Sequence, residues 1–453
     1  MTPQPQLSKS SVSPARATAF DILLRVDRES SFASDLLHSH AHERLSTADH
    51  ALATELVMGV LRWRSRLDDE IATASAQPLS KLDVEILISL RLALHQFLWL
   101  DRIPRRAALH ESVELVKRAR KRSAVPFVNA VLRKLSASQR PAIIADAQST
   151  APEIAAALAH PLWLVERWTR EYGLTAARKI CQYDQTIPAT AIRLRSPAAE
   201  EQLQQQGIAL APGHLLASAR CVQAGDVTKT QAFRDRAIVI QDEASQLVAA
   251  LVGAGTNILD CCAAPGGKTL ALADRNPTAK IAAIELHPHR SRLLQRLLHP
   301  RSSRIQIVTA DAQHLPLTQK FDLVLTDVPC SGTGTLARNP EIKWRLNRGD
   351  LAELHPRQIA ILRSALTQVA SGGRLIYSTC SLEKEENEDV VEEVLADNPS
   401  FRLLDCALEL ERLKDAGDLT WVGSSLTRGL YLRTIPGIHP CDGFFAAILE
   451  RIN

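Results

Sequence analysis

The chain has 453 residues, 45% of them hydrophobic and 23% charged, and its formal net charge is +4 at pH 7. This length exceeds one ordinary domain, and the apolar content is ample for folded cores. Eight cysteines without disulfide-like spacing indicate a reducing compartment rather than a disulfide-stapled secreted protein. The chain opens without an apolar signal core, and no stretch reaches the roughly 18 apolar residues of a membrane span. We therefore expect a cytoplasmic protein with no membrane partner.

Residues 1–150 carry the basic excess of the chain, with 21 Lys and Arg against 16 Asp and Glu. Apolar residues recur there at helical spacing within residues 19–26, 52–61 and 84–97. The pattern predicts a bundle of five to seven helices, given ordinary helix lengths. We interpret residues 1–150 as an all-α domain.

A dense basic cluster runs from Lys117 to Arg122 and precedes the apolar run from Pro126 to Arg133. Clustered cations of this kind bind phosphates, although the ordinary alternative is a solvated helix end. The run from Arg62 to Arg64 offers a second candidate contact to nucleic acid.

Residues 151–236 change in character. A short helical stretch begins near His160, and the runs from Thr190 to Leu194 and from Gly207 to Leu210 are typical of strands. We interpret this segment as a small α+β module that helps to hold RNA, with Arg193 as its best candidate contact.

The third segment, residues 237–453, begins a doubly wound α/β pattern. A short buried strand ends at Asp260 and is followed by a turn of small residues, Cys262 to Lys268, that opens a helix. Small residues allow the backbone to approach a ligand closely. A phosphate-binding loop is excluded, because its first glycine would fall on Cys262, and no Gly-x-Gly-x-x-Gly dinucleotide fingerprint follows the strand.

Three further strands are predicted to end at carboxylates. They lead to Glu285, Asp311 and Asp327, and the carboxyl ends of parallel strands meet at one edge of a sheet. A carboxylate at the position of Glu285 can accept hydrogen bonds from ribose hydroxyls, and Asp311 is placed to meet an adenine edge. The pattern predicts a nucleoside-binding site at this edge.

Two cysteines follow neighbouring predicted strands at the same edge: Cys330, after Asp327 and a proline, and Cys380, after a threonine. Carbon 5 of a pyrimidine becomes nucleophilic only after a thiolate has added to carbon 6, and a second thiol can help to release the product. We expect a helix from about Glu383, whose N-terminus would favour a thiolate at Cys380. The acidic residues after Glu383 would oppose this effect if they faced the sulfur.

The motifs at 260–268, 327–334 and 379–381, in this order, closely resemble the signature of the Sun/Fmu family of RNA cytosine-5 methyltransferases. The runs 338–344 and 442–445 look like later elements of the same family. The N-terminal segment, notably residues 124–133, resembles the NusB-like RNA-binding fold of the family's bacterial ribosomal-RNA member. Glu285 and Val328 depart from the commoner aspartate and alanine, without loss of the chemistry.

The resemblance implies a Rossmann-like S-adenosylmethionine-dependent methyltransferase core, an all-α NusB-like N-terminal domain and a small α+β linker module. It implies that Cys380 is the nucleophile and that Cys330 assists release. From the residues themselves we expect Asp327 to hydrogen-bond either the base or the methionine ammonium, and Lys268 to lie near the site as an electrostatic helper. The cofactor contacts fall on Cys262, Ala263, Ala264, Pro265, Gly266, Gly267, Lys268, Glu285, Asp311 and Asp327.

The resemblance leads to the prediction of a 16S ribosomal-RNA cytosine-5 methyltransferase that acts as a monomer, before the small subunit is fully assembled, and without a metal. Three competing interpretations remain open. In DNA cytosine-5 methyltransferases the cysteine after proline attacks, which would make Cys330 the nucleophile. Transfer RNA is a second possible substrate, because the catalytic motifs do not choose the RNA. The third is an RNA-binding assembly factor with an inert methyltransferase fold.

Overall fold

The computed structural model describes residues 12–29, 31–39, 45–140, 142–143, 145–298 and 303–452. The chain divides into two compact units. The helical unit comprises the described parts of Met1–Thr186 together with Leu336–Arg345, and the sheet unit comprises the described parts of Ile187–Thr335 and Leu346–Asn453. The division at residues 150 and 236 stays a prediction. No described helix is long and apolar enough to cross a membrane.

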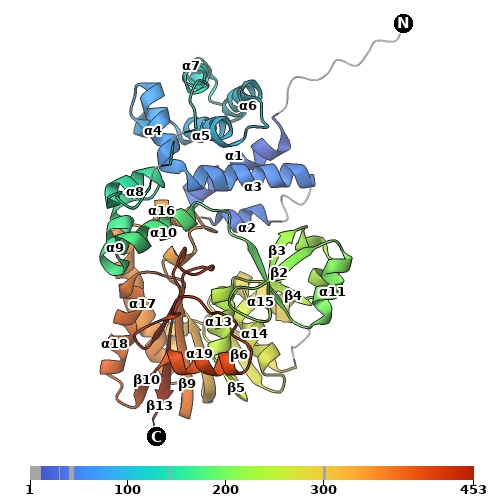
Figure 1. Cartoon of the computed structure of the whole chain (residues 1–453), viewed down its shortest axis with the longest axis vertical. Helices are drawn as coiled ribbons and strands as arrows, with labels where there is room; N and C mark the ends of the chain where they lie inside the picture. Colours follow the sequence, from blue (N-terminus) through green and yellow to red (C-terminus); the bar gives the residue numbers. More distant parts are fainter. Residues whose placement is uncertain are drawn as a thin grey trace. The chain divides into compact units, whose positions relative to one another are not determined.

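The helical unit has an all-α architecture (Figure 1). Its N-terminal part confirms the predicted helical bundle. The helices are α1 (Pro14–Glu29), α2 (Ala33–Leu37), α3 (Thr47–Arg62), α4 (Arg64–Ser75), α5 (Val84–Trp99), α6 (Arg105–Arg118), α7 (Val125–Leu135), α8 (Ala151–Ala157), α9 (Leu162–Tyr172), α10 (Leu174–Asp184) and α16 (Ile342–Arg345), with 3-10 turns at Leu79–Lys81 and Arg122–Ala124.

Local capping explains where several of these helices begin. The Ser46 side chain accepts the Asp49 backbone N–H at the start of α3, and Thr150 and Glu153 form a capping box at α8. Pro126 lies in the first turn of α7, where its missing N–H costs nothing. The α5 helix is apolar on almost every side and is the most buried of the bundle, so it forms the centre of this core.

The segment Leu336–Arg345 belongs to the helical unit although its neighbours in sequence belong to the sheet unit. The Lys343 ammonium donates to the Arg62 carbonyl at 3.0 Å, and the Trp344 indole donates to the Leu61 carbonyl at 2.5 Å. Arg345 donates to the Val26 carbonyl at 2.7 Å. Carbonyls at the ends of α1 and α3, which lack helical partners, are therefore satisfied by this segment.

The sheet unit is built on a nine-stranded mixed sheet. Its strands are β5 (Asn257–Asp260), β6 (Lys280–Glu285), β7 (Ile305–Thr309), β8 (Phe321–Asp327), β9 (Val369–Thr379), β10 (Phe401–Leu404), β11 (Thr427–Arg428), β12 (Tyr431–Arg433) and β13 (Phe445–Arg451). Its helices are α13 (Glu243–Leu251), α14 (Gly267–Arg275), α15 (Pro288–Leu298), α17 (Arg348–Leu366), α18 (Glu388–Ala396) and α19 (Cys406–Asp415).

The strand order is β11-β12-β13-β9-β8-β5-β6-β7, and β10 pairs with β13. Strands β7, β6, β5, β8 and β9 run parallel, and β13 is antiparallel to β9. The strand order reverses direction at β5, and ligands bind at such a switch point outside the carboxyl ends of the strands. The predicted doubly wound, Rossmann-like core is confirmed.

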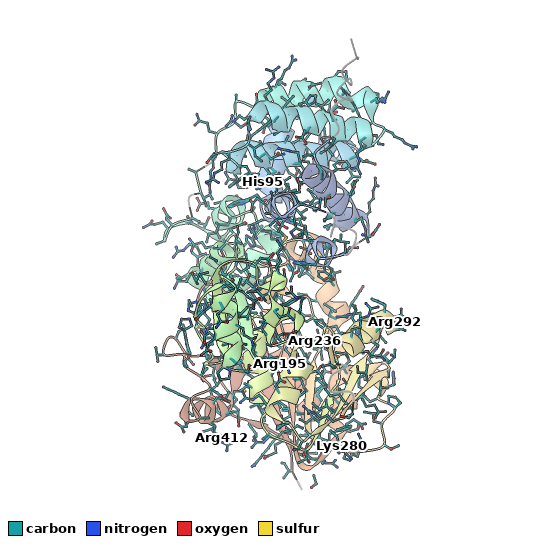
Figure 2. The ribbon with its side chains drawn as sticks, turned by 90° about the vertical axis from the view of Figure 1, so that its right-hand side faces the viewer. His95, Arg195, Arg236, Lys280, Arg292 and Arg412 are labelled. Atoms are coloured by element: carbon teal, nitrogen blue, oxygen red, sulfur yellow. The ribbon has the colours of Figure 1, made fainter. Side chains whose placement is uncertain are left out.

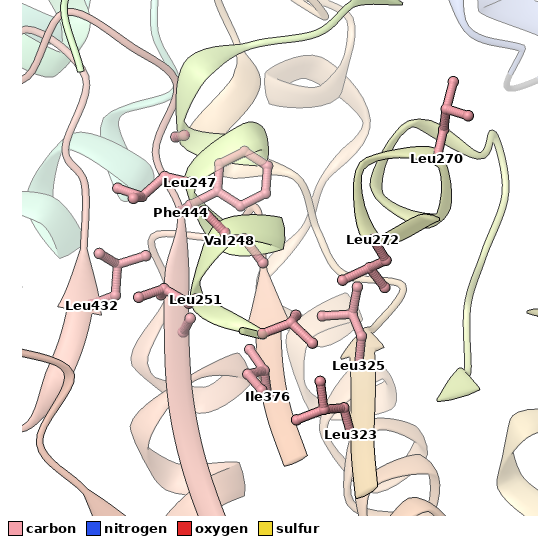
Figure 3. Close-up of a cluster of buried hydrophobic side chains, with 14 of the residues drawn as sticks. Leu247, Val248, Leu251, Leu270, Leu272, Leu323, Leu325, Ile376, Leu432 and Phe444 are labelled. Carbon is pink, nitrogen blue, oxygen red and sulfur yellow. The ribbon is translucent and has the colours of Figure 1, made fainter. Parts of the chain in front are cut away.

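Large aliphatic side chains hold the helices to this sheet. Figure 3 shows Leu247, Val248 and Leu251 of α13 close to Leu325 of β8 and Ile376 of β9. All five side chains are at most 1% exposed. Each such side chain contributes about 1.5–3 kcal/mol by leaving water, so the sheet is a rigid platform for the residues at its edge.

A small antiparallel sheet of order β2-β3-β1-β4 precedes the large one. It comprises β1 (Thr190–Leu194), β2 (Ala209–Pro212), β3 (Ala219–Ala224) and β4 (Ile238–Ile240), with α11 (Ala198–Gln205) and α12 (Gln231–Arg234). The predicted strand at Thr190–Leu194 is confirmed, and the one from Gly207 begins two residues later than expected. Arg195 joins this sheet to α14 through Asp274, at 2.8 Å, and also donates to the Arg236 carbonyl (Figure 2).

Candidate functional site

A cavity of about 220 Å³ opens at the carboxyl edge of the parallel strands. Glu285 ends β6 and Asp327 ends β8, and Asp311 follows β7 by two residues. All three carboxylates line the cavity, together with Cys330 and Cys380. The structure therefore brings together at one strand edge the residues that the sequence placed at strand ends.

The turn after β5 forms the floor of a second cavity of about 120 Å³, which shares Cys262, Ala264 and Asp327 with the first. Gly266 has φ of +111°, and a Cβ atom there would lie 2.6 Å from the Leu297 side chain. Only glycine suits this position, so the backbone runs close to α15 and α14 begins at Gly267. The remaining predicted turn residues, Ala263, Pro265, Gly267 and Lys268, also line this cavity.

The polar groups that line the two cavities fit S-adenosylmethionine. The buried Glu285 carboxylate is anchored by the His287 N–H at 2.8 Å, and Asp311 is anchored by the Gln313 N–H at 2.9 Å. Carboxylates fixed in this way are acceptors for ribose hydroxyls and an exocyclic amine. The small-residue turn would carry the rest of the cofactor, beside Gln241, whose side chain also lines the second cavity.

The two cysteines lie side by side. Cys330 follows β8, Cys380 follows the neighbouring β9, and their sulfur atoms are 3.4 Å apart. The hydrogen bond to Cys380 and then burial raise the pKa of the Cys330 thiol well above its usual range. Cys330 is therefore held as a thiol, with its sulfur in hydrogen-bond contact with the Cys380 sulfur.

Asp327 and Lys268 form an ion pair between the two cavities. The Lys268 ammonium lies 2.7 Å from Asp327 Oδ2, and the Ser378 hydroxyl donates to Asp327 Oδ1 at 2.8 Å. Burial lowers the pKa of Lys268, but the charge and hydrogen bond of Asp327 outweigh it, so the pKa is raised overall. Lys268 is therefore a fixed positive charge at the site.

Asp260, at the end of β5, is almost fully buried and accepts the Thr269 hydroxyl at 2.7 Å. Burial raises the pKa of Asp260 to about 6, against the lowering effect of that hydrogen bond. Its side chain binds the turn to α14, because Thr269 lies in the first turn of that helix.

The expected helix at Glu383 is not formed. Residues Lys384–Glu386 make a 3-10 turn, and α18 begins at Glu388, eight residues after Cys380. The helix-dipole effect fades within one turn, so it does not activate Cys380. The acidic run matters in another way that the sequence did not reveal, because Glu386 is fully buried and hydrogen-bonds the serines that follow both cysteines.

Two expected RNA contacts are buried instead. Arg193 is 8% exposed and pairs with Asp274 at 3.0 Å, and Arg62 is 5% exposed and donates to the Ala337 carbonyl at 3.2 Å. Side chains that hold the fold together in this way do not reach a phosphate, so the prediction for Arg193 is wrong. In the run from Arg62 to Arg64 this excludes Arg62 only, because the Arg64 side chain is 30% exposed, and a contact through Arg64 stays a prediction.

The basic cluster is exposed, but three of its cations have acidic partners. Lys117 pairs with Glu114, Arg118 pairs with Asp21, and Lys121 pairs with Asp83. Exposed pairs of this kind are weak and exchange readily with other anions.

The strand order, the glycine turn after β5 and the carboxylates at the neighbouring strand ends define an S-adenosylmethionine-dependent methyltransferase. Residues 250–450 match the family model described as 16S rRNA methyltransferase RsmB/F, and residues 13–137 match the NusB family. The chain belongs to the RsmB/F family.

Curated relatives match along nearly the whole chain. A Bacillus subtilis protein described as probable ribosomal RNA small subunit methyltransferase B is 31% identical over 98% of this chain and 100% of its own. A Vibrio cholerae protein described as ribosomal RNA small subunit methyltransferase B is 30% identical over 91% of this chain and 92% of its own. The RsmB-like architecture predicted from the motifs is therefore confirmed.

Solved structures share the fold. The crystal structure of PH0851 covers 98% of this chain and all of its own, with a TM-score of 0.78 and 22% identity. The crystal structure of NSun6 from Pyrococcus horikoshii with SFG covers 65% of this chain and 98% of its own, with a TM-score of 0.55 and 19% identity.

Proposed function

We propose that this chain methylates carbon 5 of a cytosine in 16S ribosomal RNA through a covalent bond between Cys380 and carbon 6. The observation that carries the proposal is the pair of sulfur atoms 3.4 Å apart in the cavity that also holds Glu285 and Asp311. Two adjacent thiols beside a methyl-donor site match a reaction in which one thiol attacks and the other assists release. The curated relatives are named for small-subunit ribosomal RNA, which supports this RNA as the substrate.

The Cys380 thiolate adds to carbon 6, and Asp327 hydrogen-bonds the base so that protonation at ring nitrogen 3 promotes this addition. S-adenosylmethionine supplies the electrophilic methyl group that carbon 5 then takes. A water, or Cys330 in its thiolate form, removes the proton from carbon 5, and the bond between Cys380 and carbon 6 breaks to restore the ring. Lys268, paired with Asp327, stabilises negative charge that develops at the base. The target base must leave its stack to enter the cavity.

The N-terminal part supports RNA binding. Its match to the NusB family covers the basic cluster Lys117–Arg122. Arg120 and Arg122 are exposed, and we assign the cluster to the phosphate backbone of the RNA. Because such contacts carry little sequence information, the cytosine is chosen by RNA shape and by the cavity.

Covalent capture tests the proposal. Wild type, Cys380→Ala and Cys330→Ala are incubated with tritiated S-adenosylmethionine and undermodified 16S ribosomal RNA, and products are resolved on denaturing gels. We expect Cys380→Ala to lose at least about a thousandfold in methyl transfer and Cys330→Ala to accumulate a protein–RNA adduct. The reverse pattern would make Cys330 the nucleophile.

Two parallel measurements distinguish this reaction from transfer-RNA methylation and from a role in assembly alone. Labelling of transfer RNA but not ribosomal RNA would move the substrate to transfer RNA. Absence of labelling together with no calorimetric affinity for S-adenosylmethionine would favour an assembly factor without activity.

A further inference from the structure

One buried carboxylate connects the two cysteine loops. Glu386 is 0% exposed. Its Oε1 accepts the Ser331 N–H at 2.8 Å and the Gln358 amide at 2.9 Å. Its Oε2 accepts the Ser381 hydroxyl at 2.5 Å and also the Ser331 hydroxyl. Ser331 directly follows Cys330 and Ser381 directly follows Cys380, so Glu386 binds the neighbours of both sulfur atoms.

Burial of the Glu386 carboxylate costs free energy unless all of its hydrogen bonds are made. A buried carboxylate loses its hydration, and only a full set of hydrogen bonds compensates for that loss. Both oxygens of Glu386 have their donors, and the donors come from three separate segments: the loop after β8, the loop after β9, and α17. A saturated network across such distant segments fixes one geometry, because moving any loop leaves a polar group unpaired.

Other bonds reinforce the same junction. The Gly334 N–H donates to the Cys380 carbonyl at 2.9 Å, and the Leu382 N–H donates to the Thr333 hydroxyl at 2.9 Å. The Tyr377 hydroxyl donates to the Glu386 carbonyl at 2.6 Å, which ties the turn that carries Glu386 to β9. The two loops therefore move as one body with Glu386 at its centre.

We propose that Glu386 is a positioning residue that holds the Cys330 thiol within reach of the base bound to Cys380, and thereby controls product release. This inference rests on the proposed function. Attack needs only Cys380, whereas release needs the second thiol to meet the same base, so loosening the junction slows release more than attack. A displacement of about 1 Å at a reacting group costs up to about a hundredfold in rate.

The variants Glu386→Ala and Glu386→Gln separate position from charge. Alanine leaves both serine hydroxyls and the Ser331 N–H without their acceptor. Glutamine keeps the shape: its oxygen accepts the Ser331 N–H and its NH₂ group donates to the serine hydroxyls, which also accept. We expect glutamine to restore much of what alanine loses.

Asp322→Ala is the matched control. Asp322 lies at the amino end of β8, opposite Asp327, and accepts the Thr256 N–H, the Thr256 hydroxyl and the Asn257 N–H at 2.7 to 2.9 Å. Its loss removes a comparable set of bonds from the same unit without touching either cysteine loop.

The first measurement does not depend on RNA. The full-length variants are treated with diamide, which takes up the two protons and two electrons that the thiols lose, and the Cys330–Cys380 disulfide is quantified by peptide mass spectrometry. At a sulfur separation of 3.4 Å the wild type should cross-link quickly. We expect Glu386→Ala to cross-link at least about tenfold more slowly, and Asp322→Ala and Glu386→Gln to remain within about threefold of the wild type. Equal rates in Glu386→Ala and wild type would overturn the proposal.

The second measurement is the ratio of protein–RNA adduct to methylated RNA. Glu386→Ala should raise this ratio at least about tenfold, as Cys330→Ala does, with an unchanged KM for S-adenosylmethionine. A variant that merely unfolds would lose adduct and product together. If Cys330→Ala forms no adduct, the proposed function fails. If Cys330→Ala forms adduct but the Glu386→Ala ratio stays at the wild-type value, only the role of Glu386 fails.

Discussion

Two lysines, one in each unit, have pKa values that move in opposite directions, although the Lys343 side chain is buried and that of Lys268 is only 12% exposed. Lys268 of the sheet unit lies 2.7 Å from the Asp327 carboxylate, and its pKa is raised. Lys343 of the helical unit donates to a carbonyl, that of Arg62, and burial lowers its pKa from 10.5 to about 7. Burial lowers the pKa of an ammonium, and a carboxylate in direct contact offsets that effect.

The contrast fits what each lysine does. In the proposed reaction Lys268 acts as a charge beside the base, and its partner in the structure is an ion, Asp327. Lys343 lies in the segment Leu336–Arg345, where its role is to pack and to hydrogen-bond. Variants of Lys343 should therefore change the stability of the helical unit, and variants of Lys268 should change the rate of methyl transfer.

The largest expected effect is on the pH dependence of stability in the helical unit. Between pH 7 and about 10 the unfolded chain keeps a proton on Lys343 that the folded chain has lost, so stability should rise with pH in this window. The full change is about 3–5 kcal/mol at 1.36 kcal/mol per pKa unit. Lys343→Met should abolish this rise. The measurement is urea unfolding at pH 7, 8.5 and 10.

Tryptophan fluorescence can follow this unit selectively, because five of the six tryptophans lie within it: Trp63, Trp99, Trp163, Trp168 and Trp344. The quantity compared is the difference in the free energy of unfolding between wild type and Lys343→Met at each pH, because the contributions of groups that titrate in both proteins cancel in it. Parallel pH curves for the two proteins would mean that Lys343 stays charged when buried.

The second effect is on catalysis. Lys268→Met removes the positive charge beside Asp327, and we expect kcat to fall by about 10²–10³, equal to roughly 3–4 kcal/mol of transition-state stabilisation. The measurement is single-turnover methyl transfer to undermodified 16S ribosomal RNA. Lys280, exposed at the start of β6, provides the control (Figure 2). Lys280→Met removes the same charge at the amino end of the strand and should leave kcat within about twofold of the wild type. Equal losses of kcat in Lys268→Met and Lys280→Met would show that the loss comes from the change in net charge and not from the position of Lys268.

The third expected effect is on the pH dependence of stability in the sheet unit, through the buried carboxyl group of Asp260. Burial raises the pKa of Asp260 to about 6, so the folded chain holds a proton between pH 4 and 6 that the unfolded chain releases. Stability of the sheet unit should therefore fall by about 2–3 kcal/mol as pH rises through this window. Asp260→Asn keeps an acceptor for Thr269 and should remove the slope. Hydrogen exchange of β5 amides, corrected for intrinsic rates, measures it; a slope retained in the variant would assign it to another group.

The residues at the strand ends could be predicted from the sequence. The strand ends at Asp260, Glu285 and Asp327 were predictable, because apolar runs define strands and parallel strands bring their carboxyl ends together. The cysteines could be placed beside these residues for the same reason. Local pattern and sheet topology were sufficient for this part.

Residues whose role depends on distant partners escaped prediction. Glu386 binds Ser331, 55 positions away, and in sequence it is one acid among several. Arg193 looked available for RNA until Asp274 was seen to pair with it, 81 positions away. Lys343 gave no sign that its neighbours in the fold would be helices near the N-terminus. Hydrogen bonds between remote segments leave no periodic signal, so only the structure reveals them.

The smallest expected effect concerns charges that are paired but exposed. Arg118 and Lys121 of the basic cluster pair with Asp21 and Asp83 on the surface. Such exposed pairs add little to stability, so they compete only weakly with phosphate. The double variant Asp21→Ala/Asp83→Ala should therefore bind 16S ribosomal RNA about threefold more tightly at low salt, with a steeper dependence on salt concentration. Filter binding from 50 to 300 mM salt measures both.

Asp101→Ala is the control for that last measurement, because Asp101 is exposed in the same unit and forms no ion pair with the cluster among the described residues. It removes negative charge without releasing a cation. If Asp101→Ala tightened binding as much per charge, the gain would come from net charge alone and the pairing would have no effect. If neither variant changed the salt dependence, the phosphates would be bound elsewhere. Tighter RNA binding by the double variant alone would show that an acidic partner limits what an exposed cation can bind. The same holds for the lysines of the interior, and exposure to solvent only makes the interaction weaker.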